Sequence, residues 1–344
     1  MINDERFEEY SSKLNVRQTE KAIQLIKNFF EQQLAVELKL FRVTAPLFVA
    51  SGYGINDDLD GANSPVIFKP ISLGGKKLEV VQSLAKWKRL ALADQKIEAG
   101  YGLYTDMNAI RPGENLDTTH SFYVDQWDWE RVITIKERNL SFLKQVVNQI
   151  YGILKRLEFF IHDHYDLGFS LPEKIVFIHA EEAFKRYPQL APQDRERELA
   201  RQYGAIFVIG IGGRLADGSF HGHRAPDYDD WITPTESDFK GLNGDIILWN
   251  QVLDDCLEIS SMGIRVDQQS LLKQLELTGN ENRKELYYHQ KVLNQELPLS
   301  IGGGIGQSRL CMQFLRKLHI GEVQAAVWDQ ATIEKCKKFK VALL

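Results

Sequence analysis

The glycine-rich run at 302–306 constrains the fold more than any other feature of this sequence. Glycines let a backbone approach a ligand closely, and a turn from a strand into a helix offers N–H groups to an anion. The run leads into an amphipathic stretch at 310–318, and Arg309 stands at the expected helix start, where its side chain could reach a phosphate. Because Arg309 replaces the last glycine of G-x-G-x-x-G, and the G-K-[ST] ending of a P-loop is missing, neither of those nucleotide-binding folds is supported. The alternative is a glycine-rich packing turn beside a surface arginine.

The composition is that of an ordinary globular chain and excludes several classes of function. Forty-two Lys and Arg against 47 Asp and Glu give a net charge of −5, whereas nonspecific nucleic-acid binders are usually basic. The three cysteines include no C-x-x-C pair, so neither a disulfide framework nor a zinc cage is expected. The acidic N-terminus does not resemble a targeting segment, and no apolar stretch approaches the ~20 residues of a membrane span. We therefore expect a cytoplasmic protein that binds neither nucleic acid nor a membrane.

Hydrophobic periodicity predicts an α/β chain, and the absence of repeats and linkers favours one continuous body over 1–344. Apolar residues at helical spacing predict long helices over 17–40 and 139–162, and Pro192 opens a shorter one over 192–203. Buried strands are expected at the apolar runs 175–178, 205–211 and 245–249. The segment 215–240 has no clear period, and loops of that length are usually functional or mobile.

Residues 120–134 alternate in a way that is typical of a strand with two different faces. Gln126, Asp128 and Glu130 share one side, whereas Trp127 and Trp129 share the other. The pattern predicts that one side packs into the core while the opposite side lines a polar cavity.

Three further clusters could carry chemistry, and each has an ordinary alternative. The segment 254–267 has carboxylates beside serine and glycine, and these could bind Mg²⁺ together with substrate phosphates. The alternative is an acidic turn exposed to solvent. At 109–131 an arginine precedes a strand with acidic residues. This segment is either a hairpin that holds a nucleotide or an ordinary hairpin whose surface carries salt bridges. Three basic residues within 81–89 could bind a small anion, although a basic helix face is favoured for that segment alone. The histidine pairs 162/164 and 221/223 are spaced as on one face of a strand, but the lack of a nearby third ligand disfavours a metal.

Taken in order along the chain, these segments resemble the catalytic domain of class II aminoacyl-tRNA synthetases. Residues 17–50 are similar to motif 1, 109–131 to motif 2 and 301–318 to motif 3 of that class, with the aspartyl branch the most similar. Longer blocks resemble the aspartate–ammonia ligase (asparagine synthetase A) family nearly word for word; they lie at 83–89, 123–131, 224–231 and 241–245. The resemblance spans about residues 20–328.

The resemblance implies an α/β fold of the α+β type, an antiparallel sheet flanked by helices in a single catalytic domain, with a homodimer assembled through the motif 1 region. It also implies a reaction. L-aspartate and ATP would give β-aspartyl-AMP and pyrophosphate with the help of Mg²⁺, and ammonia would then convert the adenylate to L-asparagine and AMP.

Carried over onto the matching positions, the resemblance assigns a role to each candidate residue. Arg111 would clamp the α-phosphate, Arg309 would grip the distal phosphates or the adenine side, and Glu258, with Asp245, would hold Mg²⁺. Asp57 and Asp128 would orient the ammonium group of aspartate, and Asp229, along with Asp57, would help to deprotonate ammonium. The residues that would bind aspartate are Ser83, Lys88, Gln126, Asp128, Ser261 and Arg265. Further contacts to ATP would come from Glu130, Tyr228 and Gly304.

Two positions depart from the family pattern. Class II motif 2 usually reads Arg-x-Glu, whereas here Glu114 stands three residues after Arg111, which puts its contact to the base in doubt. The acid that the family places near the start of the chain is either Asp57 or Asp58, and the residues that follow favour Asp57.

Two other functions compete with the ligase. An aspartyl- or asparaginyl-tRNA ligase would need a separate tRNA-reading module, for which the chain leaves no room before residue 17 or after Arg309. A non-catalytic regulator with a synthetase fold would have no need to keep Arg111, Glu258 and Arg309. The sequence leaves open whether glutamine serves as a weak nitrogen source.

Overall fold

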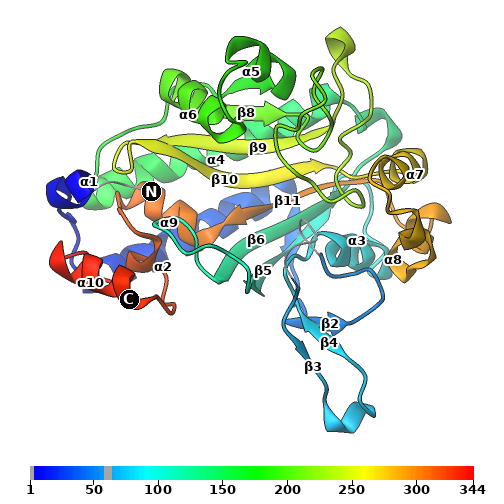
Figure 1. The fold of residues 1–344 in the computed structure, drawn as a ribbon, viewed down its shortest axis with the longest axis horizontal. Helices are drawn as coiled ribbons and strands as arrows, with labels where there is room; N and C mark the ends of the chain where they lie inside the picture. The colour runs from blue at the N-terminus through cyan, green and yellow to red at the C-terminus, as the bar shows by residue number, and fades with distance from the viewer. Residues whose placement is uncertain (1–3, 58–63) are drawn as a thin grey trace.

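A central sheet carries most of the strands in the computed structural model, which describes residues 4–57 and 64–344 (Figure 1). In chain order its strands are β1 (Leu40–Arg42), β5 (Gly102–Ile110), β6 (Tyr123–Val132), β7 (Val176–His179), β8 (Ala205–Ile209), β9 (Asn243–Asn250), β10 (Asp255–Ile264) and β11 (Ser300–Gly306). They lie in the order β1-β5-β6-β11-β10-β9-β8-β7. The two outermost pairs, β1–β5 and β7–β8, are parallel, and all other pairs are antiparallel. The expected antiparallel sheet with flanking helices is confirmed.

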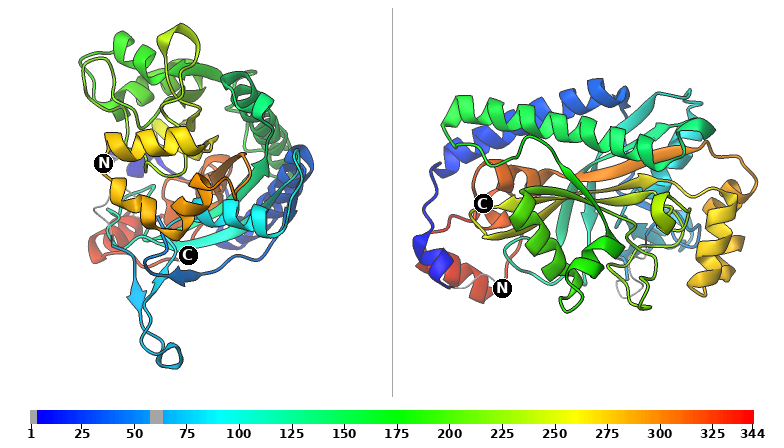
Figure 2. Two further views of the ribbon diagram at one scale, coloured as in Figure 1. Left: turned by 90° about the vertical axis from the view of Figure 1, so that its right-hand side faces the viewer. Right: turned by 90° about the horizontal axis from the view of Figure 1, so that it is seen from above.

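Two long helices, α2 (Val16–Leu38) and α4 (Leu140–Tyr165), lie side by side across one face of this sheet (Figure 2). Helix α2 begins at a capping box, because the Asn15 side chain accepts from the Gln18 backbone N–H and the Gln18 side chain accepts from that of Asn15. It ends where Lys39 adopts a left-handed conformation. Phe29 of α2 stacks on Phe160 of α4 with 4.6 Å between ring centroids. Both long helices predicted from the sequence are therefore present.

Strand β6 has the two faces that its alternation predicts. Trp127 and Trp129 are fully buried, and the Trp127 ring packs against Phe30 of α2 with centroids 4.9 Å apart. Gln126 and Asp128 point to the opposite side of the sheet, where they line a cavity. Burial of the two indoles stabilises the fold. Because side chains alternate along a strand, it also places the polar side chains of β6 on the face away from the core.

The remaining helices surround the sheet at its ends and on its other face (Figures 1 and 2). They are α1 (Asp4–Glu9), α3 (Ala85–Asp94), α5 (Ala180–Arg186), α6 (Pro192–Tyr203), α7 (Gln268–Leu277), α8 (Tyr287–Leu293), α9 (Gln307–Phe314) and α10 (Gln330–Lys338). Short 3-10 turns lie at 71–73, 135–137, 236–238, 281–285 and 320–322. The long loop predicted at 215–240 contains the third of these turns and no helix or strand.

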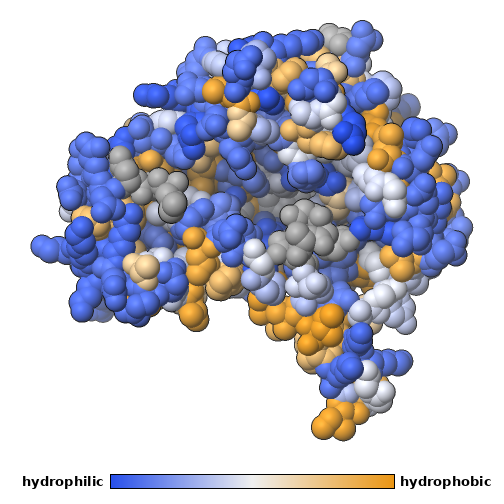
Figure 3. Space-filling view, viewed as in Figure 1, coloured by the Kyte–Doolittle hydropathy of each residue, from blue (hydrophilic) through white to orange (hydrophobic). Residues whose placement is uncertain are grey.

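A second, three-stranded sheet forms an arm that projects from the body (Figures 1 and 3). Its strands are β2 (Phe48–Ala50), β3 (Ile67–Phe68) and β4 (Leu78–Val80), with β4 in the middle. Phe48, Phe68 and Ile71 are exposed apolar side chains on this arm. Strands β1 and β2 lie on either side of Pro46 and belong to different sheets, since β1 joins the main sheet whereas β2 joins the arm.

Several interpretations drawn from the sequence are corrected by the fold. The glycines at 302–306 lie within strand β11, and the helix after them begins at Gln307. The acidic segment is strand β10 instead of a solvated turn. The basic residues of 81–89 are buried, so they do not form a surface helix face. His162 and His164 lie at the end of helix α4, not on a strand.

Within residues 4–57 and 64–344, no helix has the length and hydropathy needed to cross a membrane. All three cysteines carry free thiols, as their number and spacing suggest.

The C-terminal segment around His319 gives the fold a predicted pH dependence. Burial lowers the pKa of His319 from 6.5 to about 4, and its Nδ1 accepts from the Gly321 N–H at 3.0 Å, a bond that protonation of Nδ1 would remove. Between these two values the unfolded chain binds a proton that the folded chain does not. His319 therefore contributes stability that is fully present above about pH 6.5 and is lost as the pH falls toward 4. In thermal unfolding from pH 4 to 7, we expect a smaller fall in Tm at low pH for His319→Gln than for the wild type. Equal slopes in the two proteins would contradict this.

Candidate functional site

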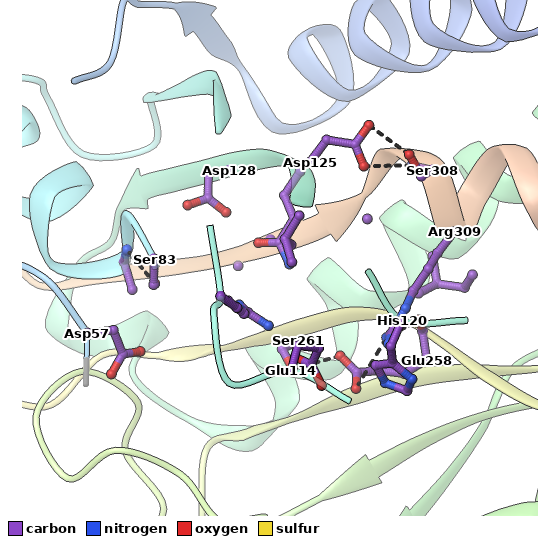
Figure 4. Close-up of a pocket in the computed structure, with 18 of the residues that line it drawn as sticks. Asp57, Ser83, Glu114, His120, Asp125, Asp128, Glu258, Ser261, Ser308 and Arg309 are labelled. Atoms are coloured by element: carbon purple, nitrogen blue, oxygen red, sulfur yellow. Dashed lines mark hydrogen bonds and ion pairs between the residues drawn. The ribbon is translucent and has the colours of Figure 1, made fainter. Parts of the chain in front are cut away.

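A polar cavity of about 420 Å³ opens on the face of the sheet opposite α2 and α4. Its floor comes from β6, β10 and β11, and its walls come from the start of α3, the segment after β5 and the loop 223–229. Figure 4 shows two ends. Asp57 and Ser83 lie at one end, which we call the Ser83 end, and Glu258, His120 and Arg309 lie at the other, which we call the Arg309 end.

The cavity brings together all but two of the side chains that the sequence singled out. Those that line it are Asp57, Ser83, Lys88, Arg111, Gln126, Asp128, Tyr228, Asp229, Glu258, Ser261, Arg265, Gly304 and Arg309. Glu130 and Asp245 are not part of the lining. Asp58, the alternative to Asp57, lies outside the described residues.

The ammonium group of Lys88 lies at the floor of the cavity, toward the Ser83 end. It is 1% exposed, donates to the Gly303 carbonyl at 2.9 Å and lies 3.3 Å from the Asp128 carboxylate. Burial lowers the pKa of Lys88, and Asp128 opposes that shift. A buried ion pair beside an open cavity provides a fixed charge pattern, which suits a ligand that carries both a carboxylate and an ammonium group.

Arg265 supplies the second buried cation, and it explains where Glu130 lies. Its guanidinium pairs with Asp229 on one side and with the Glu130 carboxylate, at 2.8 Å, on the other. Glu130 is 0% exposed and also accepts from the Ser300 hydroxyl at 2.7 Å. In this arrangement the oxygens of Glu130 hold Arg265 in place and do not line the cavity, and its contact with the nucleotide stays a prediction.

At the Arg309 end, charged groups of both signs face the cavity. Arg309 donates to the Glu258 carbonyl at 3.1 Å and lies 3.7 Å from its carboxylate. Asp245 instead pairs with Arg224 and accepts from the Ser261 hydroxyl at 2.6 Å. Burial raises the pKa of Asp245, and Arg224 acts against that rise.

The donor set partly fits a divalent cation. Mg²⁺ commonly takes one or two carboxylates together with substrate phosphates. Glu258 is exposed to the cavity and suits that role, whereas the contact of Asp245 with Arg224 leaves it poorly placed as a ligand. In the part of the chain that the structure describes, no cluster of three His, Cys, Asp or Glu side chains could hold a metal without a substrate.

The glycines of β11 form a floor on which side chains of β6 rest. A Cβ added at Gly304 would lie 2.3 Å from the Gln126 amide oxygen and 2.7 Å from an Asp128 oxygen. A Cβ at Gly302 would lie 1.9 Å from a Glu130 oxygen. The glycines are thus needed because polar side chains of the neighbouring strand cross directly above them.

Several residues that line the cavity were not assigned a role from the sequence. Arg224 opens the family block 224–231, which was a usable signal, but its role was not assigned. Asp125 accepts from the backbone N–H of Ser308 at 3.1 Å and from its hydroxyl at 2.9 Å, which fixes the first turn of α9 beside Arg309. His120 lies beside Asp117, with 2.9 Å between its ring nitrogen and the carboxylate, and no role was assigned to it although it falls within the motif 2 region 109–131.

Comparisons with known proteins show which family the chain is similar to. A family model described as aspartate-ammonia ligase matches residues 17–340. Proteins named aspartate--ammonia ligase from Bacteroides fragilis and Clostridium perfringens are 54% and 52% identical over 336 residues, covering 97% of both chains in each case. An asparaginyl-tRNA synthetase from Entamoeba histolytica, solved in complex with asparaginyl-adenylate, has a TM-score of 0.65 at 13% identity, covering 90% of this chain and 66% of that one. At that identity the structural likeness concerns the fold.

Proposed function

The chain belongs to the aspartate–ammonia ligase family, and we propose from this premise that it joins L-aspartate and ammonia to form L-asparagine while ATP is converted to AMP and pyrophosphate. One observation carries the proposal beyond the family. A single cavity has the buried Lys88–Asp128 pair and Arg265 toward one end and Arg309 with Glu258 at the other. A zwitterionic amino acid and a polyphosphate can therefore meet within it.

In the first proposed step, an oxygen of the aspartate β-carboxylate attacks the α-phosphorus of ATP. The bond from that phosphorus to the bridging oxygen breaks, and pyrophosphate leaves. Lys88, Arg265 and Gln126 would orient the aspartate carboxylates, Asp128 its ammonium group, and Ser83 and Ser261 would add hydrogen bonds. Arg111 would stabilise the charge that develops on the α-phosphate.

Arg309 would hold the distal phosphates, and Tyr228 and the Gly304 backbone would complete the ATP contacts. We propose Glu258 as the protein ligand of Mg²⁺, which when bound would neutralise part of the charge of the departing pyrophosphate. Asp245 is assigned instead to hold Arg224 and Ser261 in position.

In the second proposed step, ammonia attacks the β-carbonyl carbon, AMP leaves and a proton is released. Ammonium must first lose a proton, because its nitrogen has no free electron pair. Asp57 and Asp229 are carboxylates that line the cavity and are each 2% exposed, so they are suited to bind the cation and accept its proton.

We further propose that the whole chain acts as one catalytic domain, that it works in the cytoplasm and that it forms a homodimer through the motif 1 region. Residues from Asp57 to Gln324 line the same cavity, which supports a single catalytic unit. Three free thiols suit a reducing compartment. Exposed Val36 and Phe41, at the end of α2 and in β1, are consistent with a buried interface there.

The test supplies L-aspartate, ATP and Mg²⁺ with either ammonium or glutamine and follows asparagine, AMP and ADP. Asparagine with AMP from ammonium alone is the expected result. ADP in place of AMP would remove the adenylate and the role of Arg111 with it. If no product forms although aspartate and ATP bind, adding tRNA would separate a tRNA ligase from a non-catalytic regulator.

A further inference from the structure

Behind the Ser83 end lies a buried charge cluster centred on Asp227, outside the cavity lining. Asp227 is 0% exposed, and three donors converge on its Oδ2 atom. Lys86 Nζ lies at 3.1 Å, His289 Nε2 at 3.0 Å and Arg283 Nη1 at 3.2 Å. Because an ionised carboxylate only accepts hydrogen bonds, the Nε2 atom of His289 carries a proton.

Asp227 and its partners belong to separate segments, two of which also supply groups to the cavity. Lys86 stands in the first turn of α3, and two positions along a helix correspond to a rotation of about 200°, so Lys86 points to Asp227 while Lys88 points to the cavity floor. Asp227 itself precedes Tyr228 and Asp229, which line the cavity. The cluster therefore ties the start of α3 to the loop 223–229.

His289 extends the cluster to a third segment, the one that carries Asp57. A Cβ added at Gly54 would lie 3.1 Å from the His289 ring and 3.0 Å from Leu286, so helix α8 packs directly against the backbone at 53–54. The Tyr288 N–H donates to the Tyr53 carbonyl at 3.2 Å. Asp57 follows three residues after Gly54.

We propose that Asp227 is a positioning residue for the amino-acid substrate: through Lys86, His289 and Arg283 it holds together the segments that deliver Lys88, Asp57 and Asp229 to the Ser83 end. The proposal rests on the function proposed above, since it assumes that this end receives aspartate and ammonium. The contacts of Arg111 with the Gln82 carbonyl and of Arg309 with the Glu258 carbonyl do not involve Asp227 or its three partners, so we expect the proposed phosphate contacts to depend on the cluster less than the aspartate contacts do.

Electrostatics favour a cluster of fixed geometry. Burial alone would raise the pKa of Asp227, but Lys86, His289 and Arg283 together hold it well below its usual range. The carboxylate therefore stays ionised, and removal of its charge would take an ion-pair partner from Lys86, which is 2% exposed.

The main test is Asp227→Asn, which keeps the shape of the side chain and removes its charge. We expect the KM for aspartate to rise at least about tenfold, as displacement of groups remote from the reaction can do, while the KM for ATP changes less than about twofold. His289→Leu should shift the aspartate KM in the same direction, and His289→Gln, which restores an N–H donor, should reverse most of that shift. Hydrogen exchange in Asp227→Asn should increase at 49–57, 83–94 and 224–231 together.

The matched control is Glu158→Gln, another buried carboxylate, which accepts from the backbone N–H groups of Ser170 and Leu171 and does not line the cavity. It should lower Tm without changing either KM. If Asp227→Asn does not fold, Arg283→Met removes one donor from the rim of the cluster and should raise the aspartate KM by a smaller factor.

Unchanged aspartate KM and unchanged exchange in Asp227→Asn would overturn the proposal, as would equal rises in both KM values. If the wild type makes no asparagine, the proposed function fails on its own. The exchange of the three segments then still decides whether Asp227 anchors them.

Discussion

Arg111→Ala is expected to slow aspartate-dependent AMP formation by on the order of a hundredfold or more, because removing one donor aimed at developing charge typically costs that much. Arg111 follows strand β5 directly, its side chain lines the cavity, and its Nη2 lies 3.4 Å from the Gln82 carbonyl. The guanidinium is thus held beside the Ser83 end but keeps donors for a phosphate. Its effect should appear in kcat, since charge on the α-phosphate grows in the transition state.

The measurement is the rate of AMP and pyrophosphate release at saturating ATP and aspartate. Arg186→Ala is a suitable control, because that arginine lies on α5, contacts the Tyr203 hydroxyl and is not part of the cavity lining. Near-normal turnover of Arg111→Ala would exclude Arg111 from the mechanism.

How far the sequence predicts such a site depends on the physical signal that each residue leaves. The two faces of β6 were predictable because burial of Trp127 and Trp129 imposes a period of two. The long helices were predictable because their apolar stripes repeat at 3.6 residues. Glycines, by contrast, carry no hydrophobic pattern, so the run at 302–306 was interpreted as a turn although it pairs with β6 and β10 as a central strand.

The positions of charged residues are even harder to predict from the local sequence than those of glycines. Lys86, Lys88 and Arg89 look like a solvated helix face, because their partners lie 40 to more than 200 positions away. These partners come close only when α3 packs against the sheet, where Asp128, Asp227 and the Pro298 carbonyl surround the three basic side chains. The resemblance to a family identified most of the residues that line the cavity, but it did not distinguish them from Glu130 and Asp245, which hold arginines and do not line it.

The same buried packing makes Lys88→Met the sharpest test of which substrate occupies the Ser83 end. A hydrogen bond to a charged group contributes about 1.5–3 kcal/mol, so we expect the KM for aspartate to rise roughly 10- to 150-fold. The KM for ATP should change far less, because Arg111 and Arg309, and not Lys88, are the residues proposed to contact the phosphates. Steady-state kinetics with each substrate varied in turn measures both values.

Lys88→Met will also lower stability, since it leaves Asp128, which is 3% exposed, without its cation. Lys317→Met separates the two effects. Lys317 is 2% exposed and donates to the hydroxyls of Ser12 at 2.7 Å and Thr19 at 2.9 Å, away from the cavity. Loss of this buried lysine should lower Tm while leaving both KM values unchanged. A larger rise in the ATP KM than in the aspartate KM for Lys88→Met would place Lys88 on the nucleotide side and reverse the orientation proposed for the two substrates.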